Sequence, residues 1–417
     1  MTAARYPMIW RSVAALALAA AGACSSEPPT GPPKALEALP RPLTSAEQQV
    51  AAAGNTFSFS LFRQINQAQR DSNVFISPLS ASMALGMTMN GAAGATYDGM
   101  RTTIGFGGAA QPEINDGYKG LIALLRGLDS HTDFRIANSI WYRNTFPFEQ
   151  SFLNAGERYF DAEIRPLDFA DPASLTTINN WVDRSTNGKI EEIIESIEPL
   201  DVMFLINAIY FKANWRSPFD KSDTRDAPFY AADGSTQTAR LMHQQKAVRY
   251  LETPELQAVD LLYGNTAFAM TVLLPKQGTD VNALVAGLTE EKWNAWTDQF
   301  REHEIALYLP KFTLEYERTM NDDLTALGMG IAFVPRQADF TPMSPLGREL
   351  YISYVKQKTY VDVHEEGTEA AAVTAVGIRV VSMPPTMRVD RPFVFAIRER
   401  FSGTILFVGK MVRMPNG

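Results

Sequence analysis

Hydrophobic positions change their spacing along the chain. In the first half they recur with helical periodicity, as in GLIALLRGL (120–128) and TTINNWVDRST (176–186). In the second half, runs of leucine, aromatic and β-branched residues predict strands at 268–275, 304–316, 351–364 and 403–412. Helices early and strands late, with little alternation between them, favour an α+β fold with largely antiparallel or mixed sheets.

The segment 73–91 predicts a short strand followed by a buried helix. Asn73 to Ile76 is strand-like, and Ser77 can cap a helix that has Pro78 at its first position. The helix is apolar on nearly every side, which predicts that it lies in the middle of the fold. Asn90-Gly91 supplies its stop. The hydroxyls of Ser77 and Ser80 on such a helix need buried partners.

The predicted strand at 351–364 carries one polar anomaly. Its apolar residues share a face with Gln357 by the two-residue period of a strand. A buried amide needs hydrogen-bond partners, and we expect the serines of the central helix to provide them.

The N-terminus reads as an export signal followed by a linker. Residues 1–23 have a basic start, a short apolar run and small residues, which is typical of a signal peptide rather than a membrane helix. Cys24, the only cysteine, follows Ala-Gly-Ala, which resembles the lipobox of bacterial lipoproteins and predicts acylation of its thiol. The alternative is an ordinary A-x-A cleavage site. Proline-rich residues 24–45 predict a tether, and residues 46–417 one large domain.

Composition and motifs argue against several function classes. The net charge of −8 and the lack of a long basic run give no reason to expect nucleic acid. None of the four histidines stands in a metal-binding spacing, and one cysteine cannot form a thiolate zinc site. We find no G-x-S-x-G elbow and no P-loop. We therefore expect no enzymatic activity, no metal and no cofactor.

Several motifs in order along residues 46–417 resemble the serpins, serine protease inhibitors of the suicide-substrate type. The resemblance implies about nine helices on three sheets, with an exposed reactive-centre loop near the C-terminus. The matching stretches are NVFISPLSASMAL (73–85), INNWVDRSTNGKI (178–190), INAIYFKANWRSPF (206–219), LPKFTLEY (309–316), ADFTPMS (338–344), EEGTEAAAVTA (365–375) and RPFVFAIRERFSGTILFVGK (391–410).

The resemblance also implies a use for the small residues after Gly367. If this segment enters a sheet as a new strand, alternate residues from Thr368 onward face inward, and all of them are uncharged. Glu369 and Arg379 fall on the outer face, and no proline interrupts the segment before Met383. The alternative is an alanine-rich exposed loop with no such role.

By resemblance, the cleaved loop inserts into the central sheet and traps the protease as an acyl-enzyme. We expect a monomer whose partners are serine proteases. Counting along the family pattern places the reactive bond between Val381 and Ser382, which would suit an elastase-like protease. Arg379 is the alternative, for a trypsin-like one. A non-inhibitory binding or carrier protein is the rival hypothesis.

The remaining family positions transfer in three groups. The loop hinge comprises Glu365, Gly367, Thr368, Glu369, Ala370, Ala371 and Ala372. The shutter beneath the sheet comprises Ser77, Ser80, Asn207 and Gln357, where many relatives carry histidine in place of Gln357. The breach, where insertion begins, comprises Trp215 and the ion pair of Lys311 with Glu365. Ala213 replaces a usual glycine and is expected to stiffen a turn.

Overall fold

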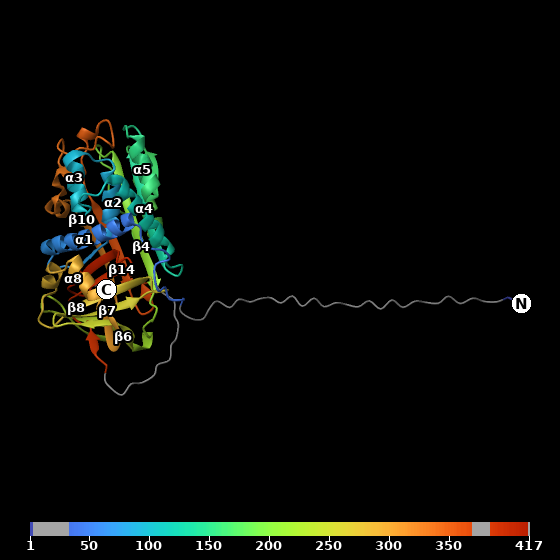
Figure 1. Ribbon diagram of the computed structural model, residues 1–417, viewed down its shortest axis with the longest axis vertical. Coiled ribbons are helices and arrows are strands. Elements are labelled where there is room, and N and C mark those ends of the chain that lie inside the picture. Colours follow the sequence, from blue (N-terminus) through green and yellow to red (C-terminus); the bar gives the residue numbers. More distant parts are fainter. Residues whose placement is uncertain (3–32, 369–383, 416–417) are drawn as a thin grey trace. The chain divides into compact units, whose positions relative to one another are not determined.

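The computed structural model describes residues 1–2, 33–368 and 384–415, and its regular elements all lie in the unit Pro32–Gly417 (Figure 1). This described part contains nine α-helices. They are α1 (Ser45–Ala68), α2 (Pro78–Met89), α3 (Gly94–Thr103), α4 (Gln111–Gly127), α5 (Gln150–Phe160), α6 (Ala173–Ser185), α7 (Val281–Ala286), α8 (Glu290–Thr297) and α9 (Asn321–Leu324). None of these helices combines the length and apolar character needed to cross a membrane.

The largest sheet has nine strands. Its order is β1-β15-β14-β8-β7-β6-β9-β13, with β5 pairing with β6. The strands are β1 (Val74–Ile76), β5 (Arg225–Tyr230), β6 (Thr236–Glu252), β7 (Leu256–Leu262), β8 (Phe268–Pro275), β9 (Arg301–Pro310), β13 (Thr386–Arg388), β14 (Phe393–Glu399) and β15 (Ile405–Met411).

Two smaller sheets complete the fold. One has the order β12-β4-β2-β3 and the other consists of β10 and β11. Their strands are β2 (Asp133–Arg143), β3 (Ala162–Leu167), β4 (Met203–Asn214), β10 (Phe312–Thr319), β11 (Lys356–Val363) and β12 (Gly367–Thr368). Most pairs are antiparallel, while β2–β3 and β9–β13 are parallel. The predicted α+β fold with three sheets is confirmed.

Helix α2 has the predicted place and ends. The Ser77 side chain accepts a hydrogen bond from the Ser80 amide, Pro78 takes the first turn and Asn90 is the C-cap. Nearly all of its residues are buried, because it packs against β4, β15 and other helices. The helix therefore lies under the sheet that contains β4.

Two predicted strands differ from the structure. The run 304–316 is split into β9 and β10, which belong to different sheets. Pro310 has no amide hydrogen to donate to a neighbouring strand. The Lys311 amide donates to Arg240 O on β6 at 2.8 Å, so it does not take part in the pairing of β10 with β11. The predicted strand 351–364 begins only at Lys356, because the Val355 amide bonds the Asn321 side chain.

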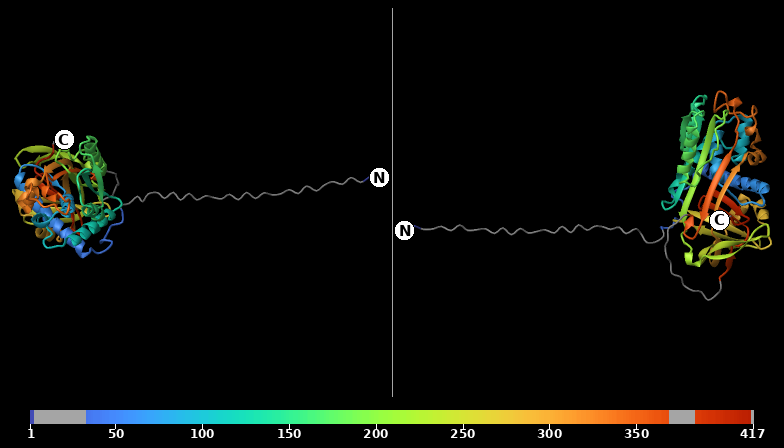
Figure 2. Two further views of the ribbon diagram at one scale, coloured as in Figure 1. Left: turned by 90° about the horizontal axis from the view of Figure 1, so that it is seen from above. Right: turned by 180° about the vertical axis from the view of Figure 1, so that it is seen from behind.

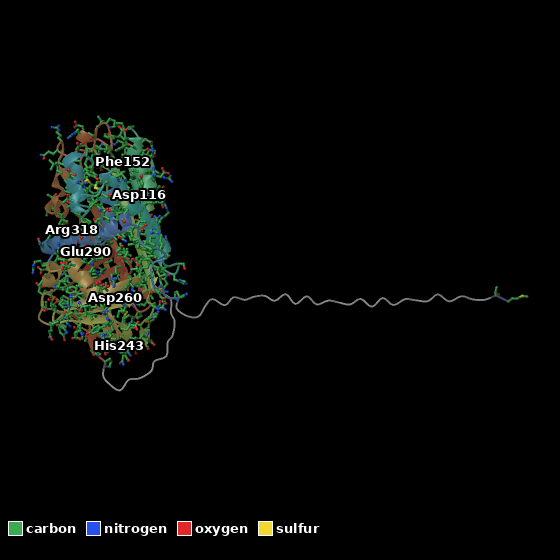
Figure 3. The ribbon with its side chains drawn as sticks, in the orientation of Figure 1. Asp116, Phe152, His243, Asp260, Glu290 and Arg318 are labelled. Atoms are coloured by element: carbon green, nitrogen blue, oxygen red, sulfur yellow. The ribbon has the colours of Figure 1, made fainter. Side chains whose placement is uncertain are left out.

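A charge pair is buried inside the nine-stranded sheet, and Figure 3 labels one of its members, Asp260. Arg398 on β14 lies 2.7 Å from the Asp260 carboxylate on β7, and the Thr271 hydroxyl on β8 donates to the same carboxylate at 2.6 Å. Because leaving one such charge buried and unpaired would be costly, this contact ties three strands into one alignment.

The segment before α1 packs against the domain from Pro33 onward. The Leu36 amide bonds Asn265 O at 2.6 Å, and Arg216 bonds Pro33 O at 2.8 Å. Leu36, Leu39 and Leu43 pack on the core. Any free tether is therefore shorter than the predicted residues 24–45.

Candidate functional site

The domain contains a slot between two strand edges. Strand β4 bonds β2 along one edge, but its other edge pairs only with the two residues of β12. Strand β11 pairs with β10 and, within the described residues, with no other strand. Both strands lie on the side of the domain seen in the right panel of Figure 2.

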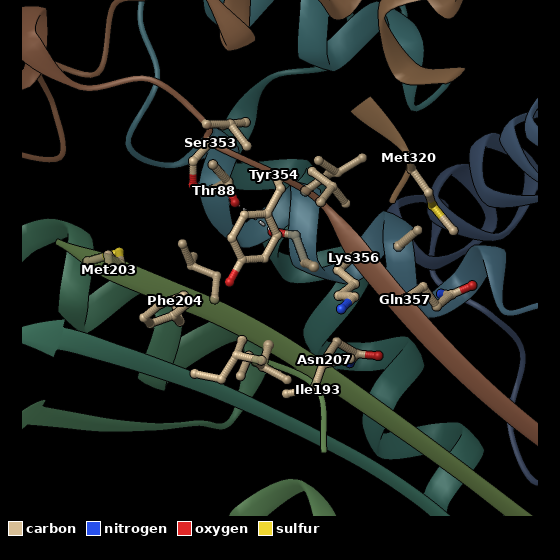
Figure 4. A pocket seen from close by; sticks show the side chains of 18 of the residues that line it. Thr88, Ile193, Met203, Phe204, Asn207, Met320, Ser353, Tyr354, Lys356 and Gln357 are labelled. Carbon is tan, nitrogen blue, oxygen red and sulfur yellow. Dashed lines mark hydrogen bonds between the residues drawn. The ribbon is translucent and has the colours of Figure 1, made fainter. Parts of the chain in front are cut away.

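Side chains from β4 and from the β11 side line a cavity of about 220 Å³ in this slot (Figure 4). Met203, Phe204 and Asn207 come from β4, and Tyr354 and Gln357 from the other side. A sheet edge is a template for pairing, so two facing edges with space between them can accept one additional strand.

The end of the slot next to Asn214 already holds the start of such a strand. Gly367 pairs with Asn214, and Thr368 pairs with Ala213, in antiparallel register. Gly367 has φ +148°, and a Cβ there would lie 2.3 Å from Ala213 O, so only glycine fits. Ala213 lies inside β4, so its predicted place in a turn was wrong.

Trp215, which directly follows β4, bonds the backbone on the N-terminal side of Gly367. Its indole N–H donates to His364 O and its amide donates to Glu366 O, both at 2.9 Å. Its ring stacks on Tyr263 with centroids 4.4 Å apart. Sequence reasoning missed Tyr263, for which the local signal is only an aromatic residue before Gly264-Asn265.

Glu365 and Lys311 form an ion pair next to the hinge. Lys311 Nζ lies 2.9 Å from Glu365 Oε2, and the Thr224 hydroxyl donates to Oε1 at 2.8 Å. Burial acts to raise the pKa of Glu365, but Lys311, the backbone and Thr224 outweigh it and leave the pKa below its ordinary value. Lys221 contacts Glu366 at 2.5 Å. The two glutamates are therefore fixed by cations from different elements.

We predict that Glu365→Gln destabilises the protein at neutral pH but much less in acid. The folded-state pKa of Glu365 is lowered, so its contribution is present above the ordinary carboxyl pKa and is lost as the pH falls through the folded value. We expect about 1 kcal/mol at pH 7, because solvent screens the two-fifths exposed Lys311.

Denaturant unfolding at neutral and at acid pH measures this difference. Glu315→Gln, on the exposed face of β10, is the matched control and should change little. A Glu365→Gln deficit that is equally large in acid would contradict the ion-pair interpretation.

Gln357 is buried, and it bonds Ser77 of the central helix. Its side-chain carbonyl accepts from the Ser77 amide at 2.9 Å, and its NH₂ donates to Ser77 O at 2.8 Å. The Ser77 hydroxyl instead donates to Leu406 O at 2.7 Å. The prediction that a serine of the central helix pairs with Gln357 is therefore confirmed for Ser77, and it is the Ser77 main chain that makes both bonds.

Ser80 and Asn207 connect α2 with β4. The Ser80 hydroxyl donates to Asn207 O at 3.3 Å, and Asn207 Nδ2 donates to Asn138 Oδ1 at 2.6 Å. Asn207 Oδ1 is buried, and no donor among the described residues reaches it. The predicted shutter residues thus line one region, but Gln357 and Asn207 stand on opposite sides of the slot (Figure 4).

The remaining predicted positions lie outside the described residues. These are Cys24, Glu369, Ala370, Ala371, Ala372, Arg379, Val381 and Ser382. Among the residues that the structure does describe, no group of three or more His, Cys, Asp or Glu side chains could hold a metal ion.

Comparisons with known proteins agree on one family. The family described as "Serpin (serine protease inhibitor)" matches residues 52–414. An uncharacterised serpin-like protein of Thermococcus kodakarensis is 34% identical over 89% of this chain and 87% of its own. Human leukocyte elastase inhibitor is 33% identical over 87% of this chain and 99% of its own.

Two solved structures share the fold. The thermophilic serpin tengpin in its native state has a TM-score of 0.80 at 32% identity and covers 92% of this chain and 97% of its own. Human thyroxine-binding globulin in complex with thyroxine has a TM-score of 0.82 at 28% identity, over 89% of this chain and 100% of its own.

Proposed function

Because the chain belongs to the serpin family, we propose that it inhibits serine proteases as a suicide substrate. One observation supports this proposal above the others. The facing edges of β4 and β11 enclose an open slot, and Gly367 and Thr368 already occupy its end next to Asn214.

The register at the hinge supports insertion of the residues that follow. If the loop continued in the register of Gly367 and Thr368, Ala370 would face Phe211, Ala372 would face Ile209 and Thr374 would face Asn207. These loop residues are small and uncharged, so they can enter a packed interior without burying a charge. Thr374 would also bring a hydroxyl to the unsatisfied Asn207 Oδ1.

The proposed reaction uses the protease's own chemistry. The protease serine attacks the carbonyl carbon of Val381, the peptide bond to Ser382 breaks, and Ser382 leaves as a free amine. Val381 stays joined to the protease by an ester. The cleaved loop of about 15 residues, roughly 50 Å when extended, then inserts beside β4 and carries the protease with it. Distortion of the protease prevents hydrolysis of the ester.

A binding or carrier role is the second candidate, favoured by the likeness to thyroxine-binding globulin. The two functions differ in what the loop must do. A carrier needs no insertion, whereas the small, uncharged inward residues after Gly367 suit insertion. For this reason the inhibitory function is the one proposed.

Reaction with an elastase-like and a trypsin-like protease tests the proposal. An inhibitor forms a complex that survives denaturing electrophoresis and contains both chains. A protein that is only cleaved, or remains intact while both proteases stay active, would favour the carrier role.

We further propose that the protein is exported and anchored at the cell envelope by acylation of Cys24. We predict that Cys24→Ala moves it from the membrane fraction to the soluble fraction of its native host. Each buried acyl methylene contributes about 0.8 kcal/mol, so several chains would anchor it firmly. Equal distribution of both versions between the fractions would instead support simple secretion.

A further inference from the structure

Tyr263 lies behind the hinge at the end of β7 and is fully buried. Its ring lies between Trp215, on which it stacks, and Phe211, which meets it edge-on with centroids 5.0 Å apart. Its hydroxyl lies 3.1 Å from Thr368 Oγ1, and either group can donate in this hydrogen bond. Tyr263 thus connects the core directly to Thr368, the second residue of β12.

The side chain of Thr368 depends on this contact. Thr368 is only 5% exposed, so its hydroxyl needs a protein partner. Trp215 bonds the hinge backbone at His364 and Glu366, whereas Tyr263 bonds the Thr368 side chain. A buried hydroxyl left unpaired costs more than the same site filled by matched apolar groups.

We infer that Tyr263 is a positioning residue that seats Thr368 in the sheet before any protease arrives. This inference rests on the proposed function. Insertion then begins from strand pairs that are already formed, whereas an unseated hinge must first make them. The seated hinge thereby increases the share of cleaved molecules that trap the protease rather than release it.

A double-mutant cycle tests the hydrogen bond itself. Tyr263→Phe keeps the ring and removes its hydroxyl, and Thr368→Val removes the partner hydroxyl. We expect each single substitution to lower the hydrogen-exchange protection of the Trp215 amide, which bonds Glu366 O, by about fivefold. The double variant should recover most of this protection, because no hydroxyl is then left unpaired.

Tyr118→Phe is the matched control. Tyr118 is also fully buried, and its hydroxyl contacts Ser82 Oγ at 2.5 Å, away from the hinge. This variant should leave the Trp215 amide protected as in the unmodified protein. Unchanged protection in Tyr263→Phe, or additive losses in the double variant, would overturn the inference.

Inhibition assays test the consequence. In reactions with an elastase-like protease, Tyr263→Phe should at least double the ratio of cleaved inhibitor to stable complex, and the double variant should lower it again. An unchanged ratio despite lost protection would show that hinge seating does not set the outcome. If the unmodified protein forms no complex at all, the proposed function fails, but the exchange cycle still tests the Tyr263–Thr368 bond.

Discussion

Replacing Thr368 with arginine should turn the proposed inhibitor of serine proteases into a substrate for them. Thr368 is buried in the sheet opposite Ala213, next to the fully buried Tyr263. An unpaired charge there would cost several kcal/mol. The arginine should therefore displace the hinge from the sheet while the reactive bond between Val381 and Ser382 can still be cleaved. Since about 1.4 kcal/mol corresponds to tenfold, we expect complex formation to fall by more than about tenfold.

Denaturing electrophoresis measures the yield of complex, and thermal unfolding before and after loop cleavage measures insertion. Thr386→Arg is the matched control, because it makes the same change at an exposed residue on the other side of the loop. It should leave both readouts unchanged. A Thr368→Arg variant that still forms full complex would refute insertion of this loop.

Replacing Val381 with arginine should move the proposed inhibition from elastase-like to trypsin-like proteases. Valine suits a small, apolar primary pocket, whereas arginine needs a pocket with an aspartate at its base. We expect the rate of inhibition of an elastase-like protease to fall by about 100-fold or more and that of a trypsin-like protease to rise similarly. Inhibition rate constants for both proteases measure this change of specificity.

Arg379→Ala separates Val381 from its rival. If the reactive bond follows Val381, this variant keeps its inhibition of the elastase-like protease. Mass spectrometry of the released C-terminal fragment then shows Ser382 as its first residue. A fragment that begins at Val380, from a stable complex with a trypsin-like protease, would show that the reactive bond follows Arg379 instead.

Local signals in the sequence were enough for several elements. The Ser77-Pro78 start and the Asn90-Gly91 stop are read from neighbouring residues, and the structure places α2 between them. The strand at 268–275 is found with both ends as predicted. The prediction of a single strand at 304–316 was wrong. The strand-like pattern continues across Pro310 and Lys311, whereas the change of sheet there depends on the distant Arg240.

The site was less accessible to sequence reasoning. Glu365 was paired with Lys311 by resemblance alone, and its second partner, Thr224, lies 141 residues away. Tyr263 and Lys221 also contact the hinge from segments far away in the sequence, and no spacing or motif predicts such contacts. Gln357 was identified as a buried amide by strand alternation, but its bonds to the Ser77 main chain depend on how α2 meets β11.

The strand order of the nine-stranded sheet has a consequence for how the chain is made. Strands β14 and β15 lie between β1 and β8, although they are the last strands to be synthesised. Val74 near the beginning pairs with Lys410 near the end, so the core of this sheet cannot close before nearly the whole chain is available. Such long-range pairing is slow to form. The two strands whose edges border the slot, β4 and β11, by contrast both precede β14 in the chain. If the loop inserts as proposed, the slot has to stay unfilled while these final strands pair, so the inhibitory form would depend on the order of the folding steps.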